Sequence, residues 1–163
     1  MVVLTIRQYG DPVLKQATKD VEEVDGTVAK LVEDMVETMY AAPGVGLAAN
    51  QVGVQRRLFV YDIGDGPRAI INPRIVETSG EWTFEEGCLS VPGLSWQIVR
   101  PNQVHLVGLS LDGEEISIEA DEYEGRVFQH EVDHLDGTLL IERLDEEQRR
   151  DALKILRARA LAG

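Results

Sequence analysis

The chain has 163 residues, of which 29 are Asp or Glu and 16 are Lys or Arg, and its formal net charge is −13. This length suits one domain, residues 1–163, with a hydrophobic core of its own. The single cysteine excludes a disulfide framework and a zinc site built from four cysteines. The acidic excess excludes general nucleic-acid binding, because phosphates would be repelled.

The charge is unevenly distributed along the chain. Residues 149–163 contain five basic residues against one acidic residue, a local charge of +4, whereas the preceding residues carry a net charge of −17. The basic side chains are Arg149, Arg150, Lys154, Arg157 and Arg159. Any attraction to nucleic acid is therefore expected in this segment alone.

No targeting or membrane segment is predicted. The apolar start of the chain is short, and Arg7, Asp11 and Lys15 follow at once, so the core of a signal peptide is missing. The longest uncharged stretch, residues 39–55, contains a proline and three glycines, which would break a membrane helix. We expect a cytoplasmic protein that contacts no membrane and keeps its cysteine reduced.

The first strong pattern along the chain is helical. Apolar residues recur every three or four positions from Val28 to Tyr40, which gives one apolar stripe. Asp25 is placed to cap this helix, and Pro43-Gly44 is placed to end it. The pattern predicts a helix that packs against the core.

Strand patterns follow, and then two more helices. Short runs of strand character lie at residues 58–63, 69–71, 104–111 and 116–120, with a tight turn at Asp112-Gly113. Helical periodicity returns from about Glu122 to Gly137, and a basic C-terminal helix is predicted over about residues 145–161. A helix, then strands, then helices without regular alternation indicates an α+β domain.

The sharpest local motif is His130-Glu131-Val132-Asp133-His134. Residues four apart lie on the same face of a helix, so both imidazoles can converge on one metal ion. Glu131 lies further round the helix, where it can reach a water molecule without being a ligand. The spacing favours a metal-dependent hydrolase of amide bonds.

Two histidines leave a catalytic metal site one protein ligand short. Glu146 and Glu147 are candidates, although they also suit the acidic first turn of the last helix. The other candidate is Cys88, in a segment (residues 85–93) that we expect to be irregular. A lone cysteine is commonly a small buried hydrophobic residue. These residues alone leave the third ligand open.

A third segment, Gly44–Gly53, is rich in small residues and contains Gln51. Small residues let the backbone approach a ligand closely, and Gln51 supplies a neutral amide donor. The lysine and hydroxyl of a phosphate-binding loop are absent from this segment. Alone, the pattern is equally typical of a glycine-rich turn.

Together the three segments resemble the peptide deformylase family. Its glycine-alanine loop ending in glutamine, its E-G-C-L-S segment and its H-E-x-D-H helix stand here in order as Gly44–Gln51, Glu86–Ser90 and His130–His134. The likeness extends roughly from Ile6 to Leu144. It implies antiparallel or mixed sheets packed around a central helix carrying H-E-x-D-H, with an N-terminal and a C-terminal helix. The single domain would then be catalytic.

The resemblance also implies a reaction. Cys88, His130 and His134 would bind one divalent metal, typically Fe(II) in the family, although Zn(II), Ni(II) or Co(II) can take its place. A metal-bound water would attack the formyl carbonyl of an N-formylmethionyl nascent polypeptide, with Glu131 as general base and acid, and formate would leave. Gln51 and the backbone N–H of Leu89 would bind the oxyanion.

Specificity would follow from shape. A tight wall around the carbonyl, built from Gly44, Val45, Gly46 and Leu89, would exclude larger acyl groups. Phe84 and Val127 are the candidates for the apolar slot that takes the methionine side chain. Where some family members carry an arginine after E-G-C-L-S, this chain has Ser95-Trp96, so contacts to the substrate backbone there remain open.

Three other classes of protein could carry these residues. An H-E-x-x-H metallopeptidase would leave Cys88 a bystander, and a cysteine hydrolase would use it as the nucleophile. A non-catalytic binding domain would carry a decayed motif, which the intact ligands, glutamate and glutamine disfavour. Arg100 and Asp133 are candidates for an ion pair that orients the ligands. The basic C-terminal segment predicts transient contact with the ribosome, against the simpler interpretation that it complements its own helix dipole.

Overall fold

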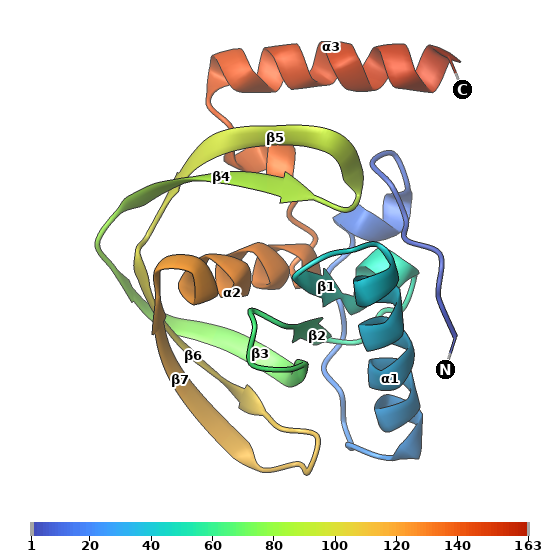
Figure 1. Ribbon diagram of the computed structural model, residues 1–163, viewed down its shortest axis with the longest axis vertical. Coiled ribbons are helices and arrows are strands. Elements are labelled where there is room, and N and C mark those ends of the chain that lie inside the picture. Colours follow the sequence, from blue (N-terminus) through green and yellow to red (C-terminus); the bar gives the residue numbers. More distant parts are fainter. Residues whose placement is uncertain (1, 163) are drawn as a thin grey trace.

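The computed structural model describes residues 2–162 and has the predicted α+β fold (Figure 1). Its helices are α1 (Gly26–Ala41), α2 (Glu122–Leu135) and α3 (Glu146–Ala162). Its strands are β1 (Gly46–Ala48), β2 (Leu58–Tyr61), β3 (Arg68–Ser79), β4 (Trp82–Cys88), β5 (Val91–Arg100), β6 (Gln103–Leu109) and β7 (Glu115–Asp121). Within residues 2–162, no helix combines the length and the apolar character needed to cross a membrane.

The strands form two antiparallel sheets. One has five strands in the order β1-β2-β3-β6-β7, and the other is the hairpin of β4 and β5. The helix α2 lies between them, with the five-stranded sheet on one side and the β4–β5 hairpin on the other (Figure 1). The central place of the H-E-x-D-H helix, expected from the resemblance, is confirmed.

The five-stranded sheet has an apolar cluster on each face. Side chains alternate along a strand, so Phe59 and Tyr61 of β2 point to the opposite face from Leu58 and Val60. Phe59 and Tyr61 pack with Phe128 of α2, with ring centroids 5.2–6.0 Å apart. The helix that carries the motif is therefore fixed on the sheet by its apolar side.

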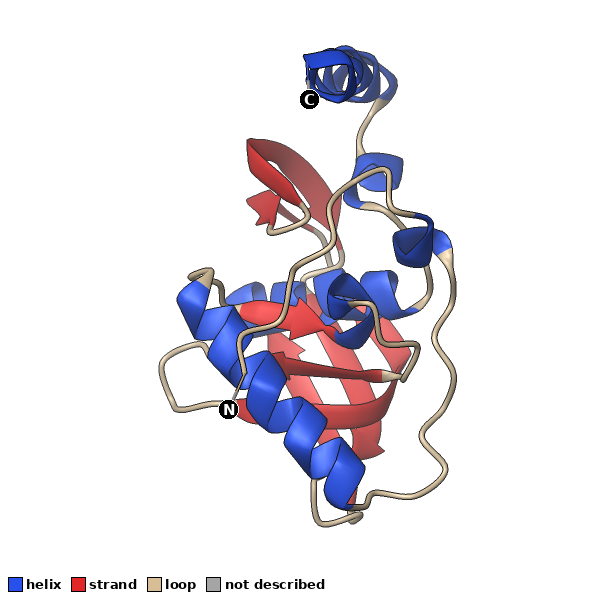
Figure 2. Cartoon of the chain, turned by 90° about the vertical axis from the view of Figure 1, so that its right-hand side faces the viewer, coloured by secondary structure: helices blue, strands red, loops and turns tan. Residues whose placement is uncertain are grey.

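The opposite face is covered by α1, as the periodicity predicts (Figure 2). Asp25 caps the helix by accepting hydrogen bonds from the backbone N–H groups of Thr27 and Val28. Val28, Val32, Met35 and Met39 are buried against β1 and β2. The end of α1 leads directly into Gly44–Gly46, so its packing also positions that loop.

The expectation of an irregular segment at residues 85–93 is wrong. It contains the end of β4, a turn at Leu89-Ser90 and the start of β5. The register of the hairpin shifts between Gly87 and Cys88, where the ladder is interrupted. This shift and the nearby Pro92-Gly93 explain why the segment lacks the regular alternation of a strand.

The helix α3 lies at the outside of the molecule, beyond the β4–β5 hairpin (Figures 1 and 2). Its buried residues Ala152 and Leu156 pack with Val91 and Ile98 of β5 and with the apolar residues of 140–144. Most of its remaining side chains are exposed, including Leu161 at 91%. The helix α3 therefore contacts the rest of the protein mainly through a narrow apolar stripe that contains Ala152 and Leu156.

Candidate active site

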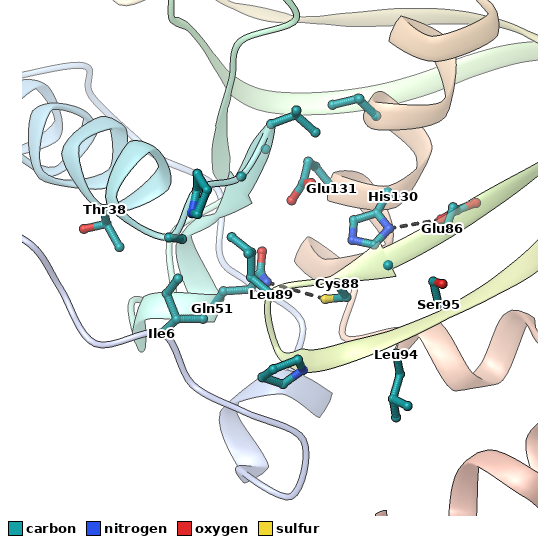
Figure 3. A pocket seen from close by; sticks show the side chains of 18 of the residues that line it. Ile6, Thr38, Gln51, Glu86, Cys88, Leu89, Leu94, Ser95, His130 and Glu131 are labelled. Atoms are coloured by element: carbon teal, nitrogen blue, oxygen red, sulfur yellow. Dashed lines mark hydrogen bonds and ion pairs between the residues drawn. The ribbon is translucent and has the colours of Figure 1, made fainter. Parts of the chain in front are cut away.

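The structure brings Cys88, His130 and His134 together. Cys88 lies at the end of β4, and the histidines lie one turn apart on α2. One ligand atom from each residue lies within 4.8 Å of the other two, and the Cys88 Sγ is 3.2 Å from the His134 Nε2. Figure 3 shows Cys88 and His130 facing the same space. Across residues 2–162 this is the one such group, and Glu146 and Glu147 are the acidic first turn of α3.

The cluster has the chemistry of a metal site. One sulfur and two imidazole nitrogens leave a coordination position open for water, as in catalytic zinc and iron sites. Burial would raise the pKa of the Cys88 thiol, but the charges and hydrogen bonds of His134 and His130 outweigh it and hold that pKa well below its ordinary value. The thiolate, which is the form that binds metals, is therefore favoured here.

Glu131 is placed beside this cluster and is buried, with 4% exposure. Its Oε1 has no hydrogen-bond partner in the chain, and burial raises the pKa of its carboxyl. A Cβ on Gly46 would lie 2.5 Å from its Oε2, so only glycine admits this approach. A carboxyl with a free oxygen and a raised pKa suits a group that accepts and returns a proton.

Gln51 faces the same cluster from the 3₁₀ helix at residues 49–52. Its Oε1 accepts a hydrogen bond from the backbone N–H of Ala48, which fixes which way the amide points. Its Nε2 therefore faces Cys88 Sγ at 3.7 Å (Figure 3) and donates to Ser90 Oγ at 3.1 Å. Leu89 lies beside Gln51, and a Cβ on Gly44 would lie 2.7 Å from its Cδ1.

A cavity of about 900 Å³ opens in front of these groups. All the predicted wall and slot residues line it, namely Gly44, Val45, Gly46, Phe84, Leu89 and Val127. Ser95 and its neighbour Leu94 line it as well, and Ile6 lines it from the other side of the view (Figure 3). Phe84 stacks on Trp82 with centroids 4.7 Å apart and meets the edge of Tyr123, so the slot has a rigid aromatic side.

The second carboxylate of the site is one that the sequence did not single out. Glu86 is buried, with 4% exposure, and accepts a hydrogen bond at 3.0 Å from His130 Nδ1. Arg100 binds both of its oxygens, at 2.7 and 3.0 Å, and Arg126 binds one at 2.7 Å. Burial would raise the pKa of Glu86, but the bonds from His130 and Arg100 outweigh it and lower that pKa to about 2. A fixed anion thus orients the His130 ring.

The two arginines that bind Glu86 each contact a second group. Arg100 also donates to Asp133 at 2.8 Å, which is the predicted ion pair, and Asp133 in turn accepts from Arg143. Arg126 lies over the rings of Trp82 and Phe84, with its Cζ 5.5 and 5.9 Å from their centroids. The sequence offered one signal for this network: Glu86 stands two residues before Cys88, so on a strand both side chains lie on the same face.

Replacing Arg100 with leucine is expected to lower the free energy of unfolding of the metal-free protein by about 3–5 kcal/mol, because Glu86 loses a buried bidentate partner. Urea unfolding followed by circular dichroism measures this change. The control is Arg74→Leu, which removes an exposed pair with Asp20 and should cost at most about 1 kcal/mol. Equal losses in the two variants would contradict a buried network at Glu86.

Comparison with known proteins places the chain in a family. The sequence profile of the family described as polypeptide deformylase matches residues 3–150. A peptide deformylase of Clostridium botulinum is 52% identical over 143 residues, which are 88% of this chain and 97% of that protein. The crystal structure of peptide deformylase from Thermotoga maritima, 44% identical, superposes with a TM-score of 0.87 over 89% of this chain and 99% of that one. The crystal structure of peptide deformylase from Ehrlichia chaffeensis in complex with actinonin is 40% identical and superposes with a TM-score of 0.92 over 98% of both chains. By sequence and by fold, this chain belongs to the polypeptide deformylase family and is a hydrolase.

Proposed function

We propose that this protein removes the N-formyl group from N-formylmethionine at the amino terminus of newly synthesised polypeptides and releases formate. The observation that carries the proposal is the convergence of Cys88, His130 and His134 with the buried Glu131 on one cavity. A hydrolase of the deformylase family needs a metal site and a proton carrier, and these four residues have the chemistry for both.

Cys88, His130 and His134 would hold one divalent cation, Fe(II) in the cell or Zn(II), Ni(II) or Co(II) in its place. When bound, the cation would supply a Lewis acid that lowers the pKa of a water molecule and polarises the formyl carbonyl. Glu86 holds His130 by its Nδ1, which leaves the Nε2 of that ring free to be a ligand.

Glu131 moves the proton. Its unpartnered Oε1 accepts the proton of the attacking water, and burial, which raises the pKa of the carboxyl, makes it a stronger base for that proton. The carboxyl then delivers the proton to the amine that leaves, which frees the amino terminus of methionine. Gly46 leaves room for the carboxyl of Glu131, since a side chain at position 46 would displace it.

Two neutral donors stabilise the developing oxyanion. The donors would be the Gln51 amide, which Ala48 orients toward Cys88, and the backbone N–H of Leu89, a residue that lines the cavity. Such donors are worth about 3 kcal/mol each in a site that excludes water. The contact of Leu89 with Gly44 leaves little room beside the carbonyl, which favours formyl over acetyl, while Phe84 and Val127 receive the methionine side chain.

The decisive assay measures formate release from formyl-Met-Ala peptides by enzyme prepared without oxygen. We expect turnover that a chelator abolishes and that divalent metal restores, and much slower cleavage of acetyl-Met-Ala. Comparable cleavage of the two peptides would refute the proposed wall. Activity that survives the chelator would favour a cysteine hydrolase, for which the 3.2 Å contact between Cys88 and His134 is also suitable.

We further propose that residues 1–163 act as one catalytic domain whose outer helix α3 meets the ribosome. Arg150, Lys154, Arg157 and Arg159 are exposed on α3, whereas Arg149 is partly engaged with the carbonyls of residues 141 and 142. Replacing Arg150, Lys154 and Arg157 with glutamine should weaken salt-dependent ribosome binding and leave formyl-peptide turnover unchanged. Unaltered cosedimentation with ribosomes at low salt would remove this contact.

A further inference from the structure

Two buried polar atoms close to the metal cluster have no hydrogen-bond partner in the chain. They are the Oδ1 of Asn50 and the Nδ1 of His134, which are not hydrogen-bonded to each other in the metal-free chain. Buried polar groups are nearly always paired, so each such atom calls for an explanation. In residues 2–162 the remaining unpartnered buried side-chain atoms are Arg126 Nε and Glu131 Oε1, and Glu131 already has a role for its free oxygen.

Asn50 is joined to His134 by a hydrogen bond. Its side chain is fully buried in the 3₁₀ helix at residues 49–52, and its Nδ2 donates to the backbone carbonyl of His134 at 2.5 Å. A carbonyl only accepts, so the atom that faces it must be the amide nitrogen. The orientation of the carboxamide is therefore settled, and its free atom is an acceptor.

His134 needs such an acceptor once it binds a metal. Its Nε2 is the nitrogen that faces Cys88 Sγ, at 3.2 Å, so Nε2 is the ligand atom. A neutral imidazole that binds a cation through Nε2 carries its proton on Nδ1. Ligating histidines generally donate that proton to a carboxylate, a carbonyl or water, as His130 does to Glu86.

We propose that Asn50 is the positioning residue for His134: its Oδ1 accepts the Nδ1–H of His134 in the metal-bound enzyme while its Nδ2 holds the backbone of the same residue. The two histidines are then oriented by different means, His130 by an anion and His134 by a neutral amide. Asn50 is next to Gln51, so one short helix orients both a ligand and an oxyanion donor. This inference rests on the metal site proposed above.

A rival explanation comes from a small cavity behind the cluster. It measures about 10 Å³ and is lined by His134, Cys88, Ser90 and mostly apolar residues. This size is at the lower limit for one water molecule, and such a water would have few polar partners. If it held the Nδ1–H, Asn50 would serve only to fasten the end of α2.

Zinc affinity, measured by competition with a chromophoric chelator, separates the two explanations. Asn50→Ala is expected to weaken Zn(II) binding by about 10- to 100-fold. The matched control is Thr18→Val, which removes a hydroxyl that donates to the next carbonyl of α2, that of Leu135, at 2.9 Å. Both variants should lower the unfolding midpoint of the metal-free protein, but only Asn50→Ala should lose zinc affinity. Equal zinc affinities in the two variants would overturn the proposal.

A measurement on the wild type does not depend on how a variant folds. In zinc-loaded protein with ¹⁵N-labelled histidine, the Nδ1 proton of His134 should be visible and slow to exchange with solvent, because its partner is a buried protein oxygen. Rapid exchange would assign the proton to water and refute the role of Asn50. If the wild type bound no zinc, the proposed metal site itself would be refuted. If the wild type bound zinc and released formate normally, and Asn50→Ala kept the same zinc affinity, only the role of Asn50 would be refuted.

Discussion

Glu131→Gln should lower kcat for formate release from formyl-Met-Ala by about 10²- to 10⁴-fold, because the amide cannot accept the proton of the attacking water. The side chain keeps its shape, so metal content should remain at the wild-type level. Thermal stability should not fall, since the buried Oε1 of Glu131 has no hydrogen-bond partner in the folded chain. Steady-state kinetics with metal analysis on the same sample tests this expectation.

Glu124→Gln is the control for Glu131. Glu124 lies on the same helix and its Oε2 is 3.3 Å from the Tyr61 hydroxyl, outside the cavity. The turnover of Glu124→Gln should stay within about twofold of the wild-type value. Near-native kcat in Glu131→Gln at full metal occupancy would show that another group carries the proton.

Cys88→Ala should remove both the metal and the activity, because two histidines alone leave the ion without its charged ligand. The loss should be seen by elemental analysis of protein purified without oxygen, and added metal should not restore turnover at concentrations that saturate the wild type. His105→Gln is the control: this histidine lies on β6, within hydrogen-bond distance of Ser117, and its loss should leave the metal in place.

The same variant separates the competing reaction classes. Metal retained without Cys88 would indicate a glutamate as third ligand, as in H-E-x-x-H peptidases. Metal lost together with activity supports the deformylase assignment. Activity lost while a chelator has no effect on the wild type would identify Cys88 as a nucleophile.

The helices and the ligand pair could be predicted because their signals are local. The capping of α1 by Asp25 and its three- and four-residue periodicity depend on neighbours in sequence. His130 and His134 fall on one face of α2 by helical geometry alone. The third ligand lies on a distant strand, and its choice among Cys88, Glu146 and Glu147 came from a family resemblance rather than from spacing.

The features that were missed depend on tertiary contacts. Residues 85–93 of the β4–β5 hairpin were expected to be irregular, since the register shift, Pro92 and the two glycines obscure the alternation of a strand. β3 was expected at residues 69–71, yet it continues to Ser79 past a register shift near Asn72, which has a positive φ of 53°. Glu86 and Arg126 gain their roles from residues far along the chain, and no local pattern marks such partners.

The ligands come from two parts of the fold, with Cys88 on the small hairpin and both histidines on the helix that packs on the large sheet. A cation bound there would therefore cross-link the hairpin to the helix and close the intervening chain into a loop, as a covalent staple does. Folding and metal supply would then be linked by mass action: the enzyme would be most resistant to unfolding and proteolysis when the cell is replete in metal, and starvation for metal would lower its abundance as well as its activity.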